Sequence, residues 1–221
     1  VTDRPGMLTW EGIMPNWKRL LIASVLLIFV QTQEDAQRVS QARIQPLDPK
    51  EWTDAQREIL GPMDRGNQTT DVFKTCLRNP DLCRAWMPFT LYLLSDKNSL
   101  TTRDKELLIL RTSWLCRADY DWAHHVARAK QAGLTDEEIQ RIPKGPDARG
   151  WSSFDALLLR ATDELHADQF IKDATWKSLA ERYNERQLMD AVFTVGQYVM
   201  VSMFLNSAGI QLEPGFTGLP K

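Results

Sequence analysis

This sequence of 221 residues has almost no excess of charge of either sign. The 27 lysines and arginines nearly balance the 29 aspartates and glutamates, which gives a formal net charge of -2 and a pI of about 6.0. No run of like charges is long enough to act as a basic arm. The protein therefore lacks a field that would attract nucleic acid, and we expect no nucleic acid among its partners.

Three other patterns are absent from the sequence. No window alternates apolar and polar residues over a useful length, so no β-strand is needed to explain it. No glycine-rich loop of the phosphate-binding kind appears, and we infer no organic cofactor. The three histidines are His124, His125 and His166. A metal site made of His125, Glu106 and His166 would have no known ligand spacing, so we expect no bound metal.

Long hydrophobic runs are also scarce. The run at residues 20–30 follows Lys18 and Arg19 and is too short for a comfortable membrane span. Its size and flanks are those of a secretory signal peptide. We expect residues 1–37 to form an N-terminal extension with a signal peptide or a membrane anchor, and the protein to be exported or periplasmic. A buried N-terminal helix is the alternative, and an uncleaved segment would tether the protein to a membrane.

Helix signals dominate the remainder of the chain. Thr135 with Glu138 forms a capping box, and Thr101 with Asp104 resembles one. Helices are expected at about 53–61, 71–78, 80–94, 101–115, 119–132, 135–143, 153–166, 173–182 and 185–207. The fold class predicted is all-α, with one helical domain over residues 43–215.

The stretch from Glu106 to Gly133 holds most of the groups that can do chemistry. Asp121 and His125 are four residues apart on one predicted helix, so the carboxylate can orient or charge the imidazole. Tyr120 and His124 form a second such pair, about 100° around the same helix, and only one pair is expected to point fully into a site. Glu106 reaches the same place if its helix packs against the next as a hairpin.

Each of these pairs also has a plain structural explanation. An Asp and a His four residues apart on a helix are more often a satisfied surface or core pair than a catalytic dyad. Three ionisable groups in an otherwise apolar hairpin, with Trp114 and Trp122 nearby, favour a site, because burying such groups costs free energy unless they are paired or used. The two interpretations stay open on the residues alone.

A family resemblance adds to this pattern. Residues 106–111 (Glu-Leu-Leu-Ile-Leu-Arg), 118–125 (Ala-Asp-Tyr-Asp-Trp-Ala-His-His) and 132–139 resemble the core motif of the carboxymuconolactone decarboxylase and alkyl hydroperoxidase D (AhpD-like) superfamily. His125 falls on the family histidine, Glu106 on its glutamate and Tyr120 on a frequent tyrosine. The resemblance implies an AhpD-like helical bundle that assembles as a homo-oligomer, a trimer or a hexamer.

The sequence departs from the family at the two cysteine positions, which are Ala118 and Asp121. In the peroxidase branch these cysteines cycle between dithiol and disulfide, which neither residue can do. Cys116 is expected to face nearly the opposite side of the helix from Ala118, as a buried free thiol. The decarboxylase branch needs no thiol, and the resemblance there implies that His125, with Asp121 or Glu106, acts as a general acid.

Three functions follow as hypotheses. The leading one is a cofactor-independent, lyase-type enzyme that acts on a small carboxylated or lactone substrate through His125, Glu106, Asp121 and Tyr120. The second is an AhpD-like hydroperoxide reductase, and the third is a non-catalytic helical binding protein. Separately, Cys76 and Cys83 flank the predicted helix break at residues 79–80. They would form a disulfide in an exported protein and remain two buried thiols in the cytosol.

Overall fold

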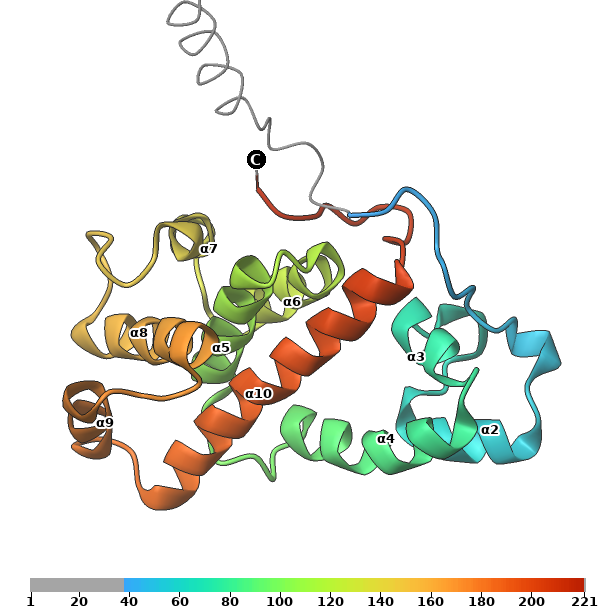
Figure 1. Cartoon of the computed structure of the whole chain (residues 1–221), viewed down its shortest axis with the longest axis horizontal. Helices are drawn as coiled ribbons and strands as arrows, with labels where there is room; N and C mark the ends of the chain where they lie inside the picture. The colour runs from blue at the N-terminus through green and yellow to red at the C-terminus, as the bar shows by residue number, and fades with distance from the viewer. Residues whose placement is uncertain (1–37, 221) are drawn as a thin grey trace, which may run out of the picture. The chain divides into compact units, whose positions relative to one another are not determined.

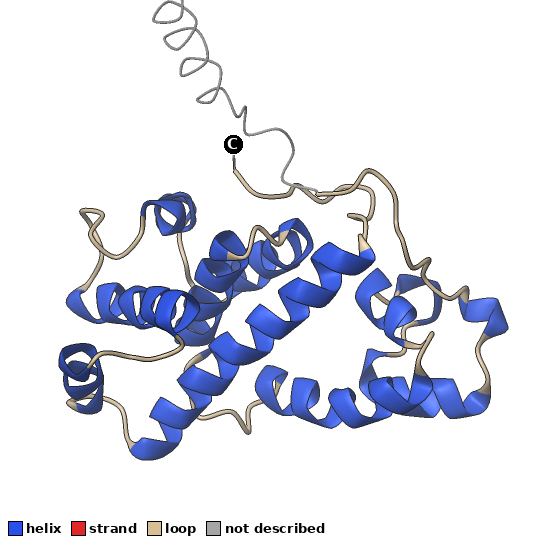
Figure 2. Cartoon of the chain, in the orientation of Figure 1, coloured by secondary structure: helices blue, strands red, loops and turns tan. Residues whose placement is uncertain are grey.

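The computed structural model describes residues 38–220, and the regular secondary structure of this part of the chain is all helical, with no strand (Figure 2). The signal peptide or anchor expected in residues 1–37 lies outside the described residues. The α-helices are α2 (Asp54–Leu60), α3 (Asp71–Cys76), α4 (Pro80–Leu94), α5 (Thr102–Leu115), α6 (Asp119–Gln131), α7 (Asp136–Arg141), α8 (Ser153–Asp168), α9 (Asp173–Ala180) and α10 (Glu185–Ala208). Short 3-10 turns are η1 (Pro49–Glu51), η2 (Gly61–Met63), η3 (Gly66–Gln68) and η4 (Ile142–Lys144).

Side-chain caps set where several helices begin. The capping box of Thr135 with Glu138 is present as predicted. At α5 only half of the predicted box forms. The Thr101 hydroxyl accepts a hydrogen bond from the Asp104 backbone N–H, but the Asp104 carboxylate accepts from the Tyr183 hydroxyl at 2.7 Å instead of closing the box.

Helix α5 lies at the centre of the main hydrophobic core. Every residue from Asp104 to Ser113 is buried, because α6, α8 and α10 all pack against α5. A helix that is covered on all sides in this way must bury its polar residues along with its apolar ones. Glu106 is one of them, so the fold itself places an ionisable group in the core.

Helix α10 runs diagonally across the domain in front of α5 (Figure 1). By length and composition alone it could cross a membrane, but 56% of its most apolar window is buried inside the protein. That share is typical of a core helix. Its buried face carries the side chains that meet α6, including Tyr198 and Ser202.

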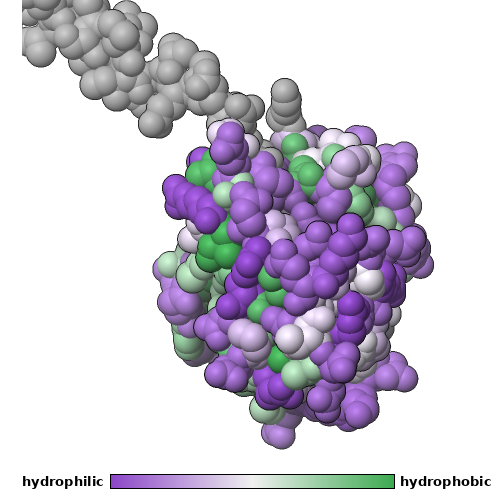
Figure 3. All heavy atoms as spheres, turned by 90° about the vertical axis from the view of Figure 1, so that its right-hand side faces the viewer, coloured by the Kyte–Doolittle hydropathy of each residue, from purple (hydrophilic) through white to green (hydrophobic). Residues whose placement is uncertain are grey.

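A smaller hydrophobic cluster forms around α2, α3 and the start of α4. Its buried members are Leu47, Trp52, Ile59, Leu60, Cys76, Leu77, Cys83 and Met87. The face of the protein on this side is mainly hydrophilic, with hydrophobic patches on its left half and at its top (Figure 3). Helix α3 ends at Cys76, two residues before the predicted end, because the chain turns at Leu77 before Pro80 begins α4.

Candidate active site

The α5–α6 hairpin brings Glu106 and His125 together, as the sequence predicts. Helix α5 ends at Leu115 and α6 begins at Asp119, with Arg117 between them in the left-handed region (φ 52°). The His125 Nδ1 atom lies 2.6 Å from Glu106 Oε2. Both residues are buried, with 6% and 2% of their surfaces exposed. A short contact of this kind fixes the orientation of the imidazole ring.

Tyr198 on α10 completes a chain of three groups. Its hydroxyl lies 3.0 Å from His125 Nε2, and the two rings meet edge to face at 5.0 Å. Burial raises the pKa of Tyr198 well above its usual value, and the nearby Asp121 and Glu106 carboxyl groups raise it further. Tyr198 is therefore a neutral hydroxyl at physiological pH, able to donate to His125 or to accept from it.

Asp121 does not have the partner that its spacing predicts. Within residues 38–220 the ring of His125 bonds to Glu106 and Tyr198, and Asp121 Oδ2 has no hydrogen-bond partner. Burial raises the pKa of Asp121 to about 8, and the nearby Ser202 hydroxyl lowers it only in part. Asp121 is thus a buried carboxylic acid, protonated at neutral pH, with one oxygen lacking a hydrogen-bond partner, one helical turn before His125.

The prediction that Cys116 and Ala118 face opposite sides of one helix is wrong, because they do not share a helix, while Cys116 is a free thiol as predicted and is only partly buried. The chain reverses at Arg117, so Cys116 ends α5 and Ala118 precedes α6. The Cys116 thiol lies near Ser202 and Asp121. Burial raises the pKa of the thiol, Ser202 lowers it and the Asp121 charge raises it. These surroundings oppose thiolate formation, so Cys116 does not have the properties of an activated thiol.

The second predicted pair, Tyr120 and His124, belongs to a separate cluster. Glu213, in the tail after α10, accepts hydrogen bonds from the Tyr120 hydroxyl at 2.6 Å and the Asp71 backbone N–H at 2.9 Å, and its Oε2 lies 2.8 Å from His124 Nε2. The His124 ring stacks between Tyr120 and Phe216. Burial alone would raise the pKa of Glu213, but these hydrogen bonds hold it at about 2. Tyr120 and His124 thus face the tail, whereas His125 faces Glu106 and Tyr198.

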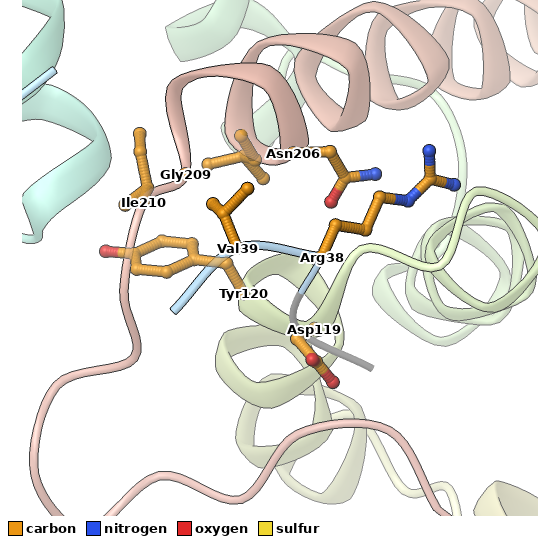
Figure 4. Close-up of a pocket in the computed structure, with 8 residues that line it drawn as sticks. Arg38, Val39, Asp119, Tyr120, Asn206, Gly209 and Ile210 are labelled. Atoms are coloured by element: carbon orange, nitrogen blue, oxygen red, sulfur yellow. The ribbon is translucent and has the colours of Figure 1, made fainter. Parts of the chain in front are cut away.

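Two chain segments cover α6 near this cluster. The segment with Arg38 and Val39 passes between the end of α10 and the start of α6, where a cavity of about 10 Å³ remains (Figure 4). The Leu219 backbone N–H donates to Asp119 Oδ1 at 2.7 Å and so fastens the tail to the first residue of α6. A cavity of this size is at the lower limit for one water molecule. His125 does not line this cavity, and only 6% of its surface is exposed.

A larger hollow of about 680 Å³ lies elsewhere, where α5 and α8 begin. Arg103 in its wall bonds to Glu138 at 2.7 Å and to Asp155 at 3.0 Å, so its charge is already balanced. His125 and Glu106 do not line this hollow. Volume alone therefore does not identify the reactive centre, and the buried hydrogen-bond chain is the better guide.

No group of three or more His, Cys, Asp or Glu residues within residues 38–220 is arranged to hold a metal ion. Sequence reasoning missed Tyr198, Ser202 and Glu213 as members of these clusters. Tyr198 and Glu213 lie 73 and 93 residues from the partners they bond, and no local spacing could have paired them. Tyr198 and Ser202 lie four residues apart on α10 and so share a buried helix face. This spacing is the one local signal that could have pointed to the cluster.

Comparison with known proteins gives a family match for part of the chain and a fold. The model of the carboxymuconolactone decarboxylase family matches residues 80–163. None of the curated proteins matches the chain in sequence. A peroxidase-related protein from Ralstonia eutropha JMP134, described as an alkylhydroperoxidase AhpD core, superposes with a TM-score of 0.68 at 18% identity, over 78% of this chain and 93% of its own.

Two other solved structures have the same fold. A peroxidase-related protein from Silicibacter sp. TM1040 has a TM-score of 0.64 at 13% identity, over 85% of this chain and 97% of its own. A cysteine-to-alanine variant of the debrominase Bmp8, in complex with 2,3,4-tribromopyrrole, has a TM-score of 0.64 at 15% identity, over 79% of this chain and 94% of its own. Residues 80–163 thus match the carboxymuconolactone decarboxylase family, and the chain has the all-helical fold of these AhpD-like structures.

Proposed function

We propose that the protein is a cofactor-independent acid–base enzyme of the carboxymuconolactone decarboxylase type, acting on a small carboxylated or lactone substrate. The observation that carries this proposal is the buried chain of contacts from Glu106 through His125 to Tyr198. All three side chains come from core helices, so the chain is held in place before any substrate binds.

The proposed chemistry is the transfer of a proton from His125 to the substrate. When carbon dioxide leaves a carboxylate, the electron pair of the broken C–C bond stays on the substrate as a carbanion or dienolate. His125 delivers a proton to that carbon from Nε2, while Glu106 holds the Nδ1–H and balances the positive charge of the ring. Tyr198 occupies Nε2 in the free protein, so its hydroxyl either relays this proton or is displaced by the substrate.

Asp121 supplies a second polar group to the same buried site. Its pKa of about 8 keeps it a neutral acid at physiological pH, able to donate a hydrogen bond to a carboxylate or carbonyl oxygen. A buried carboxyl group without a partner costs stability, and binding a substrate oxygen would remove that cost. This argues against the non-catalytic hypothesis, in which the orphaned oxygen has no use.

Substrate access requires movement of the protein. Only 8% of the His125 side chain is exposed. The proposal therefore includes an opening step in which the parts of the protein packed around His125 shift before the substrate reaches Nε2.

The hydroperoxide reductase hypothesis has less support. Ala118 and Asp121 stand at the two family cysteine positions, Cys76 and Cys83 are buried in the smaller cluster, and the pKa of Cys116 is raised. A peroxidase would need an accessible thiolate.

Two parallel assays of the purified full chain test the proposal. One measures carbon dioxide release from carboxymuconolactone-type acids, and the other measures thiol-dependent peroxide reduction. Carbon dioxide release that is lost in His125→Ala and kept in Cys116→Ser supports the lyase. Peroxide reduction that is lost in Cys116→Ser supports the reductase instead, and silence in both assays contradicts the enzyme hypothesis for these substrates.

We also propose that the protein is a homo-oligomer that uses the outer face of α10. Met189, Phe193, Met200 and Met203 are all exposed, and with Gly196 they recur at intervals of four and three residues. This spacing is that of a helix seam that packs against another helix. Light scattering should give a multiple of the 25.4 kDa chain mass. Phe193→Asp should lower that mass and the exposed control Phe170→Asp should not, whereas a monomeric wild type would contradict the proposal.

A further inference from the structure

The corner between α3 and α4 holds two thiols that the proposed chemistry does not use. Cys76 is the last residue of α3 and Cys83 is the fourth residue of α4. Their exposed fractions are 6% and 0%, and both belong to the smaller hydrophobic cluster. The two thiols lie close enough for each to shift the pKa of the other.

The backbone around Asn79 fixes this pairing. The Asn79 N–H donates to the Cys76 carbonyl at 2.9 Å, and the Asn79 carbonyl accepts from the Cys83 N–H at 2.9 Å. The Asn79 side chain also caps α4 by accepting from the Leu82 N–H. One turn therefore sets the positions of both cysteines, and a bond between them would join two helix ends that the fold already holds together.

We propose that Cys76 and Cys83 form an intramolecular disulfide that fastens α3 to α4 when the protein folds in an oxidising environment. The co-reactant is a small-molecule disulfide such as oxidised glutathione. One of the two protein thiolates attacks one sulfur of that disulfide and releases one thiol, and the other protein thiol then attacks the mixed disulfide and releases the second. Two protein thiols are oxidised, one small disulfide is reduced to two thiols, and no other reactant is required.

The surroundings of the two thiols couple their ionisation. The contact with Cys76 lowers the pKa of Cys83 against the effect of burial, and the same contact raises the pKa of Cys76. Because both sulfurs are buried in the folded protein, the exchange occurs during folding or local opening, and the disulfide is structural rather than catalytic.

The disulfide would also act on the tail indirectly. Helix α3 carries Cys76 at its end, while its first residues donate backbone hydrogen bonds to Glu213 and to the Tyr120 hydroxyl. Fastening α3 to α4 holds these donors in place. The proposal is independent of the proposed enzyme activity, because it depends on thiol state alone.

Refolding of the full chain in a glutathione redox buffer, followed by denaturation, alkylation and mass spectrometry, tests this proposal. Of the three cysteines only Cys116 should be alkylated, and peptide mapping should show Cys76 linked to Cys83. The linked form should melt about 4 °C above the reduced form.

Cys116→Ser is the matched control and should keep the link, with no thiol left to alkylate. Alkylation of all three cysteines in the wild type would overturn the proposal, as would a link that includes Cys116. Comparison of oxidised and reduced wild type requires no substitution at Cys76 or Cys83, and an unchanged thiol count excludes the bond.

Discussion

Adjacent histidines on α6 have the same kinds of neighbour in two different settings. His125 lies between Glu106 and Tyr198, and all three side chains come from core helices. His124 lies against Glu213 and Tyr120, and its carboxylate comes from the tail. The side chain of Glu106 is 3% exposed and that of Glu213 is 22% exposed.

This difference distinguishes a reactive centre held by packed helices from a contact that fastens the tail to α6. Groups fixed by packed helices keep their geometry without a substrate, which is what proton transfer needs. Groups held by a tail can separate and re-form at low cost, because few buried contacts must break. We therefore assign the chemistry to His125 and the fastening of the tail to His124, and the predictions below test that division.

The largest expected effect is on turnover. His125→Ala should lower the rate of carbon dioxide release by about 10²- to 10⁴-fold, because it removes the general acid. His124→Ala, on the neighbouring residue, should change the rate by less than about tenfold, because it loosens the tail only. Steady-state kinetics of the two variants measures both effects. Equal losses would show that the two histidines do not have separate roles.

Asp121 should control the pH dependence of stability. Its pKa is raised from 3.8 to about 8 in the folded protein. Between pH 4 and 8 the unfolded chain is therefore ionised at this residue while the folded chain is protonated. The free energy of unfolding should fall as pH rises through this range, by up to about 1.4 kcal/mol per pH unit. Above pH 8 this contribution to the slope ends, because both states are ionised.

Asp121→Asn removes the titrating group and should flatten the curve. Urea unfolding of both proteins at several pH values gives the difference in slope. Parallel curves for wild type and variant would contradict the assignment of a neutral, buried Asp121.

Loss of the tail contact should have a smaller effect, of opposite pH sign. The pKa of Glu213 falls from 4.5 to about 2 on folding, so its stabilisation is present above pH 4.5 and is lost as pH falls toward 2. Glu213→Gln should destabilise the closed tail by about 1.5 to 3 kcal/mol. Limited proteolysis at neutral pH should then cut residues 209–220 roughly ten times faster or more. The exposed control variant Glu181→Gln should be cut at the wild-type rate.

The smallest expected effect comes from a single hydroxyl group. Tyr198→Phe removes the contact to His125 Nε2 and keeps the ring, so turnover should fall by about three- to tenfold. Tyr120→Phe removes the contact to Glu213 and should leave turnover within about twofold of the wild type while loosening the tail. Tyr198→Phe should therefore slow turnover without loosening the tail, whereas Tyr120→Phe should loosen the tail and leave turnover nearly unchanged. A slower Tyr120→Phe with an intact tail would contradict this.

Local sequence rules predicted the helices well, and they failed where distant segments decide the contacts. The box at Thr135 and the hairpin that joins Glu106 to His125 both follow from short spacings. The missing half of the Thr101 box does not, because Tyr183 from a distant helix takes the Asp104 carboxylate. Homo-oligomer formation and export stay predictions.

The candidate site shows the same limit. The spacing of Asp121 and His125 correctly put both on one buried face, but their partners come from α5 and α10. Cys116 was misplaced because Arg117 adopts a left-handed conformation that is uncommon for a residue with a side chain. Glu213 gave no local signal, since its place depends on how the tail folds back over α6.

The most direct test of the account is decarboxylation in D₂O, with carbon dioxide and the deuterium content of the product measured together for wild type, His125→Ala and His124→Ala. Wild type and His124→Ala should release carbon dioxide and place one solvent deuteron on the carbon that lost it, while His125→Ala should do neither at a comparable rate. Turnover by His125→Ala at the wild-type rate would contradict the assignment of His125 as the proton donor.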